Sequence, residues 1–293
     1  MSDSPEQAIA PETISEAPEP AKESRGSMVW REAKGLFWVL LAVLGFHSFI
    51  AKPFYIPSES MMPTLLTGDR LVVGKYPFGW SWVSPSFHVL PHWRGRLLGR
   101  LPERGDIVIV TPPGGREDYI KRVIGLPGDT VEVRGGRLII NGRPVKSEPR
   151  APAMVPVDAN APCGIENFWD RRVETEAGAF CRLPIVRETL PNGVRYDTID
   201  DGRSPGDDYP PVRVGANQVF LMGDNRDHSS DSRYPLGPPN NGLGGPVPWE
   251  NIGGRAEFVT FSLDGTTQLT NPLTWLPAFR SGRAGQSLRA SKD

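Results

Sequence analysis

The sequence has few of the residues that most metal sites and many hydrolytic sites use. Its 293 residues include four histidines and two cysteines, and neither Cys163 nor Cys181 has a histidine nearby at the spacing of a zinc site. We therefore expect no metal and no cofactor. The net charge is −1 and the basic residues are scattered, so the sequence lacks the basic patch of nucleic-acid-binding proteins. No nucleic-acid partner is expected.

The two cysteines have two open interpretations. In a domain outside the cytoplasm, Cys163 and Cys181 would pair as a disulfide, whereas in a reducing compartment they would be two small hydrophobic residues. The sequence alone does not choose between the two states.

Long apolar runs are also scarce, and the sequence contains one, over residues 35–51. It is uncharged, and because it lies between Lys34 and Lys52 we predict a transmembrane anchor over residues 35–52. A signal peptide cut after Ala51 is disfavoured, because Phe49 occupies a position that requires a small residue. A buried core helix is disfavoured because the run is apolar on all sides. More basic residues precede the run than follow it, which predicts a cytoplasmic N-terminus, a single pass and an exported C-terminal domain.

The rest of the chain has the composition of a turn-rich β protein. Glycine (32) and proline (31) are abundant, whereas residues 1–25 are rich in Glu, Pro, Ala and Ser and are expected to form a disordered tail. Short apolar runs bounded by Gly, Pro and Asp predict strands. They cover residues 70–75, 106–111, 119–124, 130–134, 137–140, 218–222 and 255–261.

These strands predict a mostly β fold, with an antiparallel β-sandwich or barrel-like catalytic domain over residues 53–263. Residues 145–210 are polar and proline-rich, so we expect an inserted subdomain with little β structure. Residues 264–293 are expected to form a C-terminal tail. Residues 76–100 hold several aromatic side chains without a helix or strand period, which fits either a membrane-interface loop or a loop folded over the core.

Ser60 and Lys121 are the candidate catalytic residues. A serine is a weak nucleophile until a base takes its proton. Outside the apolar run no histidine lies in a strand or a glycine-framed turn, which leaves lysine as the base. Only Lys121, among seven lysines, is flanked by branched apolar residues that would desolvate its amine and lower its pKa toward neutrality. The hydroxyl of Ser58 and the backbone N–H of Ser60 are candidate oxyanion donors.

Four motifs resemble those of the bacterial type I signal peptidases, also called leader peptidases. In order along the chain they cover residues 57–75, 104–110, 118–129 and 223–233. The resemblance implies that Ser60 is the nucleophile and Lys121 the general base. It also implies supporting roles for Ser58 as oxyanion donor, Ser229 as the hydroxyl that orients the lysine, and an ion network of Asp231, Arg233 and Arg122. His228 stands where the family usually has asparagine.

The resemblance also implies the reaction and its location. Members of this family are membrane-bound serine endopeptidases that remove N-terminal signal peptides from exported preproteins, cutting after small residues. The matching pocket walls would be Phe54, Ile56, Met61 and Ile120. The implied partners are preproteins and membrane lipid, and the implied location is the bacterial inner membrane, with the catalytic domain on the periplasmic side.

Three other hypotheses remain open at this stage. A self-cleaving serine/lysine protease of the repressor type would need a DNA-binding segment, which the sequence does not show. A membrane-anchored scaffold with an inactive site would keep the fold without the chemistry. A fully soluble periplasmic hydrolase would begin at Lys52 after cleavage of the apolar run.

Overall fold

The computed structural model describes the chain except for residues 1–24, 86–89, 165–167, 169, 269 and 293. The chain divides into two compact units, Met1–Ala42 and Val43–Asp293. The tail predicted over residues 1–25 lies outside the described residues except for Arg25, where helix α1 (Arg25–Phe49) begins. All strands of the described residues belong to the second unit.

Helix α1 covers most of the apolar run, but its end differs from the prediction. The helix ends at Phe49, because Ala51 and Lys52 start strand β1 and pair with Gly74 and Val73. Among the described residues, no helix is both long and apolar enough to cross a membrane. The transmembrane anchor predicted over residues 35–52 is therefore not confirmed.

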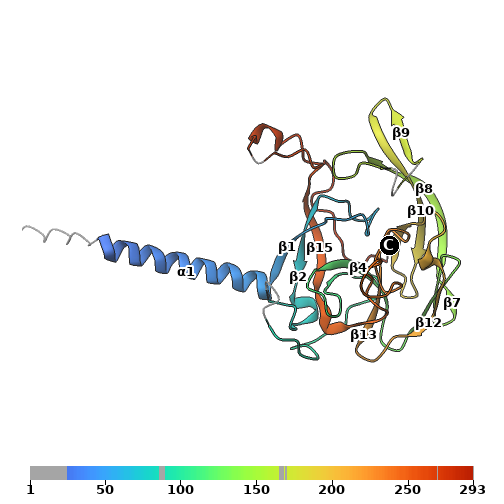
Figure 1. Ribbon diagram of the computed structural model, residues 1–293, viewed down its shortest axis with the longest axis horizontal. Coiled ribbons are helices and arrows are strands. Elements are labelled where there is room, and N and C mark those ends of the chain that lie inside the picture. Colours follow the sequence, from blue (N-terminus) through green and yellow to red (C-terminus); the bar gives the residue numbers. More distant parts are fainter. Residues whose placement is uncertain (1–24, 86–89, 165–167, 169, 269, 293) are drawn as a thin grey trace, which may run out of the picture. The chain divides into compact units, whose positions relative to one another are not determined.

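The largest sheet of the second unit is antiparallel and has the strand order β1-β2-β15-β3-β4-β13-β14 (Figure 1). Its strands are β1 (Ala51–Tyr55), β2 (Asp69–Gly74), β15 (Ile252–Ser262), β3 (Ile107–Val110), β4 (Tyr119–Gly125), β13 (Gln218–Met222) and β14 (Val247–Pro248). Strands β3 and β4 are rich in Val and Ile and are buried on both faces, as expected for central strands.

Two smaller antiparallel sheets complete the β structure. One has the order β12-β5-β6-β7, and the other has the order β11-β10-β8 with β9 also paired to β10 (Figure 1). Their strands are β12 (Tyr209–Arg213), β5 (Thr130–Arg134), β6 (Arg137–Ile140), β7 (Arg143–Pro144), β11 (Arg195–Ile199), β10 (Gly178–Thr189), β8 (Lys146–Pro156) and β9 (Arg172–Thr175). Short 3₁₀ helices lie at Tyr76–Phe78, Pro205–Asp207, Trp249–Asn251 and Pro272–Thr274.

The prediction of a mostly β, antiparallel domain with little helix agrees with this architecture. The predicted hairpin of residues 130–134 and 137–140 is present, and Gly135 and Gly136 turn it with φ values of 53° and 75°. Glycine tolerates these positive φ values, which a side chain with a Cβ disfavours.

The predictions for two segments of the chain are wrong. The region 145–210 was expected to have little β structure, but it contains the long paired strands β8 and β10. Residues 264–293 were expected to form a tail, but Leu288 is buried and its N–H donates to the Glu257 carbonyl at 2.9 Å. Arg283 also donates to the buried carboxylate of Asp69. These contacts fix the C-terminal segment on the β domain.

The aromatic loop over residues 76–100 is held against the domain in its described part. Phe78 is buried, whereas Trp93 and Leu98 are exposed. Arg96 donates to the carbonyls of Phe78 and Ile252, and so ties the loop to the start of β15. The prediction of a loop folded over the core therefore holds for the part with Phe78, whereas Trp93 and Leu98 face solvent.

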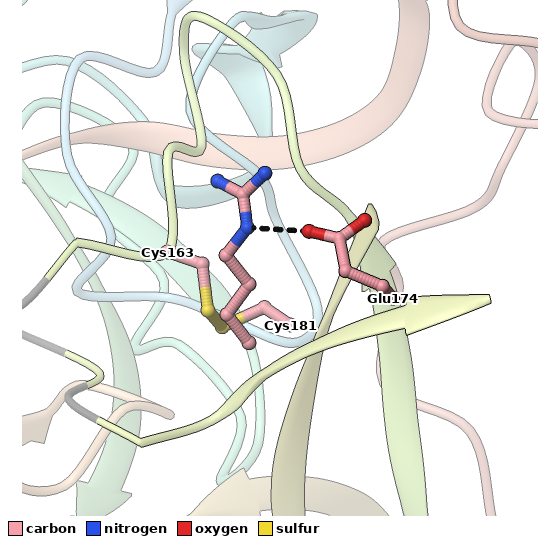
Figure 2. Close-up of a disulfide and its surroundings, with 4 residues drawn as sticks. Cys163, Glu174 and Cys181 are labelled. Carbon is pink, nitrogen blue, oxygen red and sulfur yellow. Dashed lines mark hydrogen bonds and ion pairs between the residues drawn. A yellow bond between two sulfur atoms is a disulfide. The ribbon is translucent and has the colours of Figure 1, made fainter. Parts of the chain in front are cut away.

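Cys163 and Cys181 form a disulfide with an S–S distance of 2.01 Å (Figure 2). Cys181 lies in β10, and Cys163 lies in the segment between β8 and β9. Both residues are buried in one hydrophobic cluster with Leu183, Ile185 and Ile199. The structure therefore shows the disulfide-bonded state of the two cysteines.

Candidate active site

Ser60 lies in a turn that follows β1 and is held from two sides. Within the turn, the N–H of Met62 donates to the Glu59 carbonyl at 3.0 Å. From the segment after β13, the N–H of Asn225 donates to the Ser60 carbonyl at 3.1 Å, and Asn225 Nδ2 donates to the Glu59 carbonyl at 3.2 Å. The turn is therefore fixed by residues far away in the sequence, and Ser60 is only 6% exposed.

Lys121 lies in β4, between β3 and β13, and its side chain reaches Ser60. Its Nζ donates to Ser60 Oγ at 2.9 Å, and the residue is 3% exposed. Burial lowers the pKa of Lys121 to about 8, although the nearby carboxylate of Asp231 acts in the opposite direction. Near pH 8 a large fraction of the amine is neutral, and a neutral amine at this distance is able to accept the Ser60 proton.

Ser58 places a second hydroxyl beside the first. Its Oγ lies 3.4 Å from Ser60 Oγ. A donor at this position is near the point where a carbonyl oxygen of a bound peptide would become negatively charged during attack by Ser60. The geometry is compatible with the oxyanion role implied by the resemblance.

Ser229 differs from what the resemblance implies. Its Oγ is buried and has no hydrogen-bond partner among the described residues, so the structure shows no hydrogen bond that orients Lys121. Ser229 instead packs against Gly223, where an added Cβ would lie 2.2 Å from Ser229 Oγ and 2.5 Å from the Ser60 carbonyl oxygen. Position 223 therefore has no room for a side chain.

Asp231 and Arg233 form a buried ion pair near the lysine. Arg233 Nε and Nη2 donate to the two carboxylate oxygens of Asp231, each at 2.9 Å. Burial opposes the ionisation of Asp231, but Arg233 and the backbone N–H of Gly223 hold the pKa of this carboxyl below its usual value. The carboxylate therefore stays charged close to Lys121.

Arg122 belongs to a different ion pair from the one that was predicted. Its Nε and Nη2 donate to the carboxylate of Asp224 at 2.7 and 2.6 Å. Thr64 donates to the same carboxylate at 2.6 Å. The predicted network is thus two separate pairs, Asp231–Arg233 and Arg122–Asp224, in the residues that the structure describes.

A cavity of about 330 Å³ opens at Ser60 and Lys121. Of the predicted pocket walls, Phe54 and Ile120 line it. Ile56 and Met61 do not, because both are fully buried in the hydrophobic cluster beneath the site. The remaining lining residues are Pro57, Ser58, Glu117, Asp118, Tyr119, His228, Ser230 and Asn241.

Sequence reasoning missed several of these residues. Tyr119, Ser230 and the segment from Gly223 to Arg226 lie inside the motifs, so their positions carried a signal even though no role was assigned to them. Asn241 lies outside every motif and reaches the cavity through the fold, where its carbonyl accepts from the Tyr119 hydroxyl at 3.1 Å. Among the described residues, no group of three or more His, Cys, Asp or Glu side chains is arranged to hold a metal ion.

Comparison with known proteins agrees with this site. A family model described as signal peptidase, peptidase S26, matches residues 29–261. A signal peptidase I from Rickettsia typhi is 33% identical over 249 residues, which is 80% of this chain and 81% of the relative. A signal peptidase I from Rickettsia bellii (strain OSU 85-389) is 34% identical over 241 residues, which is 79% of this chain and 73% of the relative.

Among solved structures, a signal peptidase I from Enterococcus faecalis V583 aligns with 53% of this chain and 97% of that chain at 24% identity. Its TM-score is 0.28, so this likeness adds nothing to the assignment.

The family match makes the protein a serine endopeptidase, a hydrolase of peptide bonds. More specifically, the chain belongs to the signal peptidase family, peptidase S26. The resemblance inferred from the four motifs is thereby confirmed.

Proposed function

We propose that this enzyme cleaves N-terminal signal peptides from exported preproteins, with Ser60 as nucleophile and Lys121 as general base. The observation that carries the proposal is the 2.9 Å contact between Lys121 Nζ and Ser60 Oγ in a buried site that opens into a cavity. A serine paired with a desolvated amine is a reactive nucleophile without a histidine.

The reaction proceeds in two halves. Lys121 takes the proton as Ser60 Oγ attacks the scissile carbonyl, and the oxyanion accepts hydrogen bonds from Ser58 Oγ and the backbone N–H of Ser60. Lys121 then gives its proton to the leaving amine, which releases the exported protein and leaves an acyl-enzyme. A water molecule, deprotonated by Lys121, attacks the acyl-enzyme, and Lys121 returns the proton to Ser60 Oγ as the signal peptide leaves.

Substrate binding follows from the shape of the cavity and from the strand beside it. The cavity of about 330 Å³ is walled by Phe54, Ile120 and Tyr119, which favours small side chains before the cut. Strand β1 is the outer strand of the large sheet, so one of its edges is available for an extended peptide. Pairing through the backbone would hold the peptide with its scissile bond at Ser60.

We also propose that the enzyme works at the bacterial inner membrane, with the catalytic domain on the periplasmic side. Large apolar side chains of α1 are exposed in an unbroken run, and Leu36, Trp38 and Leu40 are 60%, 64% and 59% exposed. Such a surface is unfavourable in water and favourable against lipid. Flotation of the full chain with liposomes tests whether the protein binds a membrane. A chain that stays at the bottom of the gradient would contradict membrane binding.

The activity is tested by incubating the full chain with a precursor that carries a small-x-small cleavage site. Ser60→Ala and Lys121→Ala should each lower the cleavage rate by about 10³-fold or more while the fold remains intact. Ser147→Ala is the control, because Ser147 lies in β8 and only bonds the nearby Val145 carbonyl. If the Ser60 variant cleaved at the wild-type rate, the nucleophile would be wrong. A protein without any cleavage would favour the scaffold hypothesis.

A further inference from the structure

Cys163 is joined to Cys181 of β10 in the disulfide (Figure 2). Phe168 follows five residues after Cys163 in the chain. The N–H of Phe168 donates to the Gly164 carbonyl at 2.9 Å, and its carbonyl accepts from the N–H of Arg171 at 3.1 Å. These two hydrogen bonds join the backbone of Phe168 to Gly164 and Arg171.

Phe168 is buried in a hydrophobic cluster that includes the disulfide and residues close to Ser60 in the chain. It is 2% exposed and belongs to one hydrophobic cluster with both cysteines. The same cluster contains Met62 and Leu66, which follow Ser60 in the chain. The disulfide, Phe168 and the two residues that follow Ser60 therefore belong to one packed cluster.

The ring of Phe168 also packs on His228. The two ring centroids are 5.3 Å apart and the planes are tilted by 60°, an arrangement favourable for aromatic pairs. His228 lines the same cavity as Ser60 and Lys121. The imidazole of His228 is therefore paired with the Phe168 ring and also forms part of the cavity wall.

We propose that Phe168, held by the Cys163–Cys181 disulfide, positions His228 on the wall of the substrate cavity, so that the oxidation state of the disulfide sets the affinity for substrate. Phe168 and His228 are positioning residues in this proposal, which rests on the proposed function. Reduction by an external dithiol transfers two electrons and two protons to the disulfide, giving two thiols while the dithiol becomes a disulfide. Cys163 then loses its covalent link to β10, and Phe168 is no longer held in place beside His228 through that link.

The effect is expected on substrate binding rather than on the chemical step. In the described part of the chain, the hydrogen bonds to Ser60 Oγ come from Lys121 and Ser58, and Lys121 is held in β4. Loss of a binding wall raises KM with little change in kcat. The expected rise in KM is about two- to tenfold, the factor that one aromatic pair contributes.

The first experiment measures kcat and KM for a precursor peptide in the oxidised full chain, in the Cys163→Ala/Cys181→Ala variant and in Phe168→Leu. Each variant is also made in a His228→Asn background. We expect KM to rise about two- to tenfold with kcat within about twofold, and we expect the rise to disappear when position 228 is asparagine. A rise of equal size in both backgrounds would show a purely structural effect and overturn the proposal.

Glu174→Gln is the matched control. Glu174 lies in β9, beside the disulfide, and bonds the exposed Arg172 (Figure 2). Removal of its charge changes the surroundings of the disulfide without touching Phe168 or His228. KM should stay at the wild-type value in this variant, and a rise as large as that in Phe168→Leu would contradict the proposed route.

A second measurement does not depend on activity. The imidazole Hε1 resonance of His228, assigned by its absence in His228→Asn, should shift on reduction of the disulfide and in Phe168→Leu, because the ring current of Phe168 is displaced or lost. An unchanged resonance would overturn the proposal. If the wild-type chain cleaved no precursor, the proposed function would fail, and this measurement would still decide whether the disulfide positions His228.

Discussion

Replacement of Lys121 by methionine should stabilise the folded protein while it abolishes the reaction. Methionine has a similar length and no charge, so it suits the buried site in β4. Burial lowers the pKa of Lys121 from 10.5 to about 8. The unfolded chain therefore binds more protons between these two pH values, and the free energy of unfolding of the wild-type protein rises with pH in that range.

The size of the effect follows from the same pKa. One pKa step corresponds to about 1.4 kcal/mol, so the lysine costs about 3 kcal/mol of stability at pH 7 and about half of that at pH 9.5. The part of the Lys121→Met gain that comes from removal of the charge should therefore shrink by about half between these two conditions, and the net gain by more than half. The loss of one hydrogen bond to Ser60 offsets about 1 kcal/mol of the gain at either pH.

Urea unfolding of the full chain in detergent, followed by tryptophan fluorescence at both pH values, measures the two free energies. Lys146→Met is the control, because the Lys146 side chain is 68% exposed and its removal should change stability by less than about 0.5 kcal/mol. A Lys121→Met variant that is less stable than wild type at pH 7, or whose gain is independent of pH, would refute the reasoning.

Three further substitutions test the surroundings of the site. Ser229→Ala should leave the urea midpoint unchanged or raise the free energy of unfolding by about 1 kcal/mol, because it removes a buried hydroxyl without a partner; a clear loss of stability would show that this hydroxyl is bonded. Gly223→Ala should lower kcat by about 100-fold, because the new methyl group would push on the Ser60 carbonyl, and an unchanged kcat in a precursor assay would contradict this. Asp224→Asn should cost about 3 kcal/mol in urea unfolding, because it leaves the Arg122 charge buried without its partner; a loss below about 1 kcal/mol would argue against a buried pair.

The parts of the fold that depend on local sequence could be predicted. The hairpin turned by Gly135 and Gly136 is one example, because a two-glycine turn between alternating apolar residues specifies both strands and their register. The strands around Lys121 are another, since runs of Val and Ile indicate buried strands.

The parts that depend on distant pairing could not be predicted. Strand β8 contains three prolines and is mostly exposed, so its sequence resembles a loop, and it forms a strand because β10 pairs along its whole length. The C-terminal segment was missed for a similar reason, because its order comes from pairs such as Arg283–Asp69 that join distant residues.

In the candidate site, too, the features set by local sequence could be predicted and those set by distant contacts could not. Ser60 and Lys121 could be proposed from local motifs, because the chemistry requires a hydroxyl and a desolvated amine. Two other contacts could not be predicted, because each joins residues that are far apart in the sequence. They are the ion pair of Arg122 with Asp224 and the packing of Phe168 on His228. The Ser229 hydrogen bond came only from the resemblance, and it is absent from the described residues.

The most direct test of the account is the pH dependence of kcat/KM for precursor cleavage. If neutral Lys121 is the base, kcat/KM should rise about 50-fold from pH 6 to pH 8 and level off above the pKa of about 8. Burial also lowers the pKa of Lys75 to about 8, but its Nζ donates to the Ser84 carbonyl, away from the Ser60 cavity. The rise should therefore persist in Lys75→Met, whereas Lys121→Met should be inactive. A profile without this rise, or one that disappears in Lys75→Met, would contradict the assignment of Lys121 as the base.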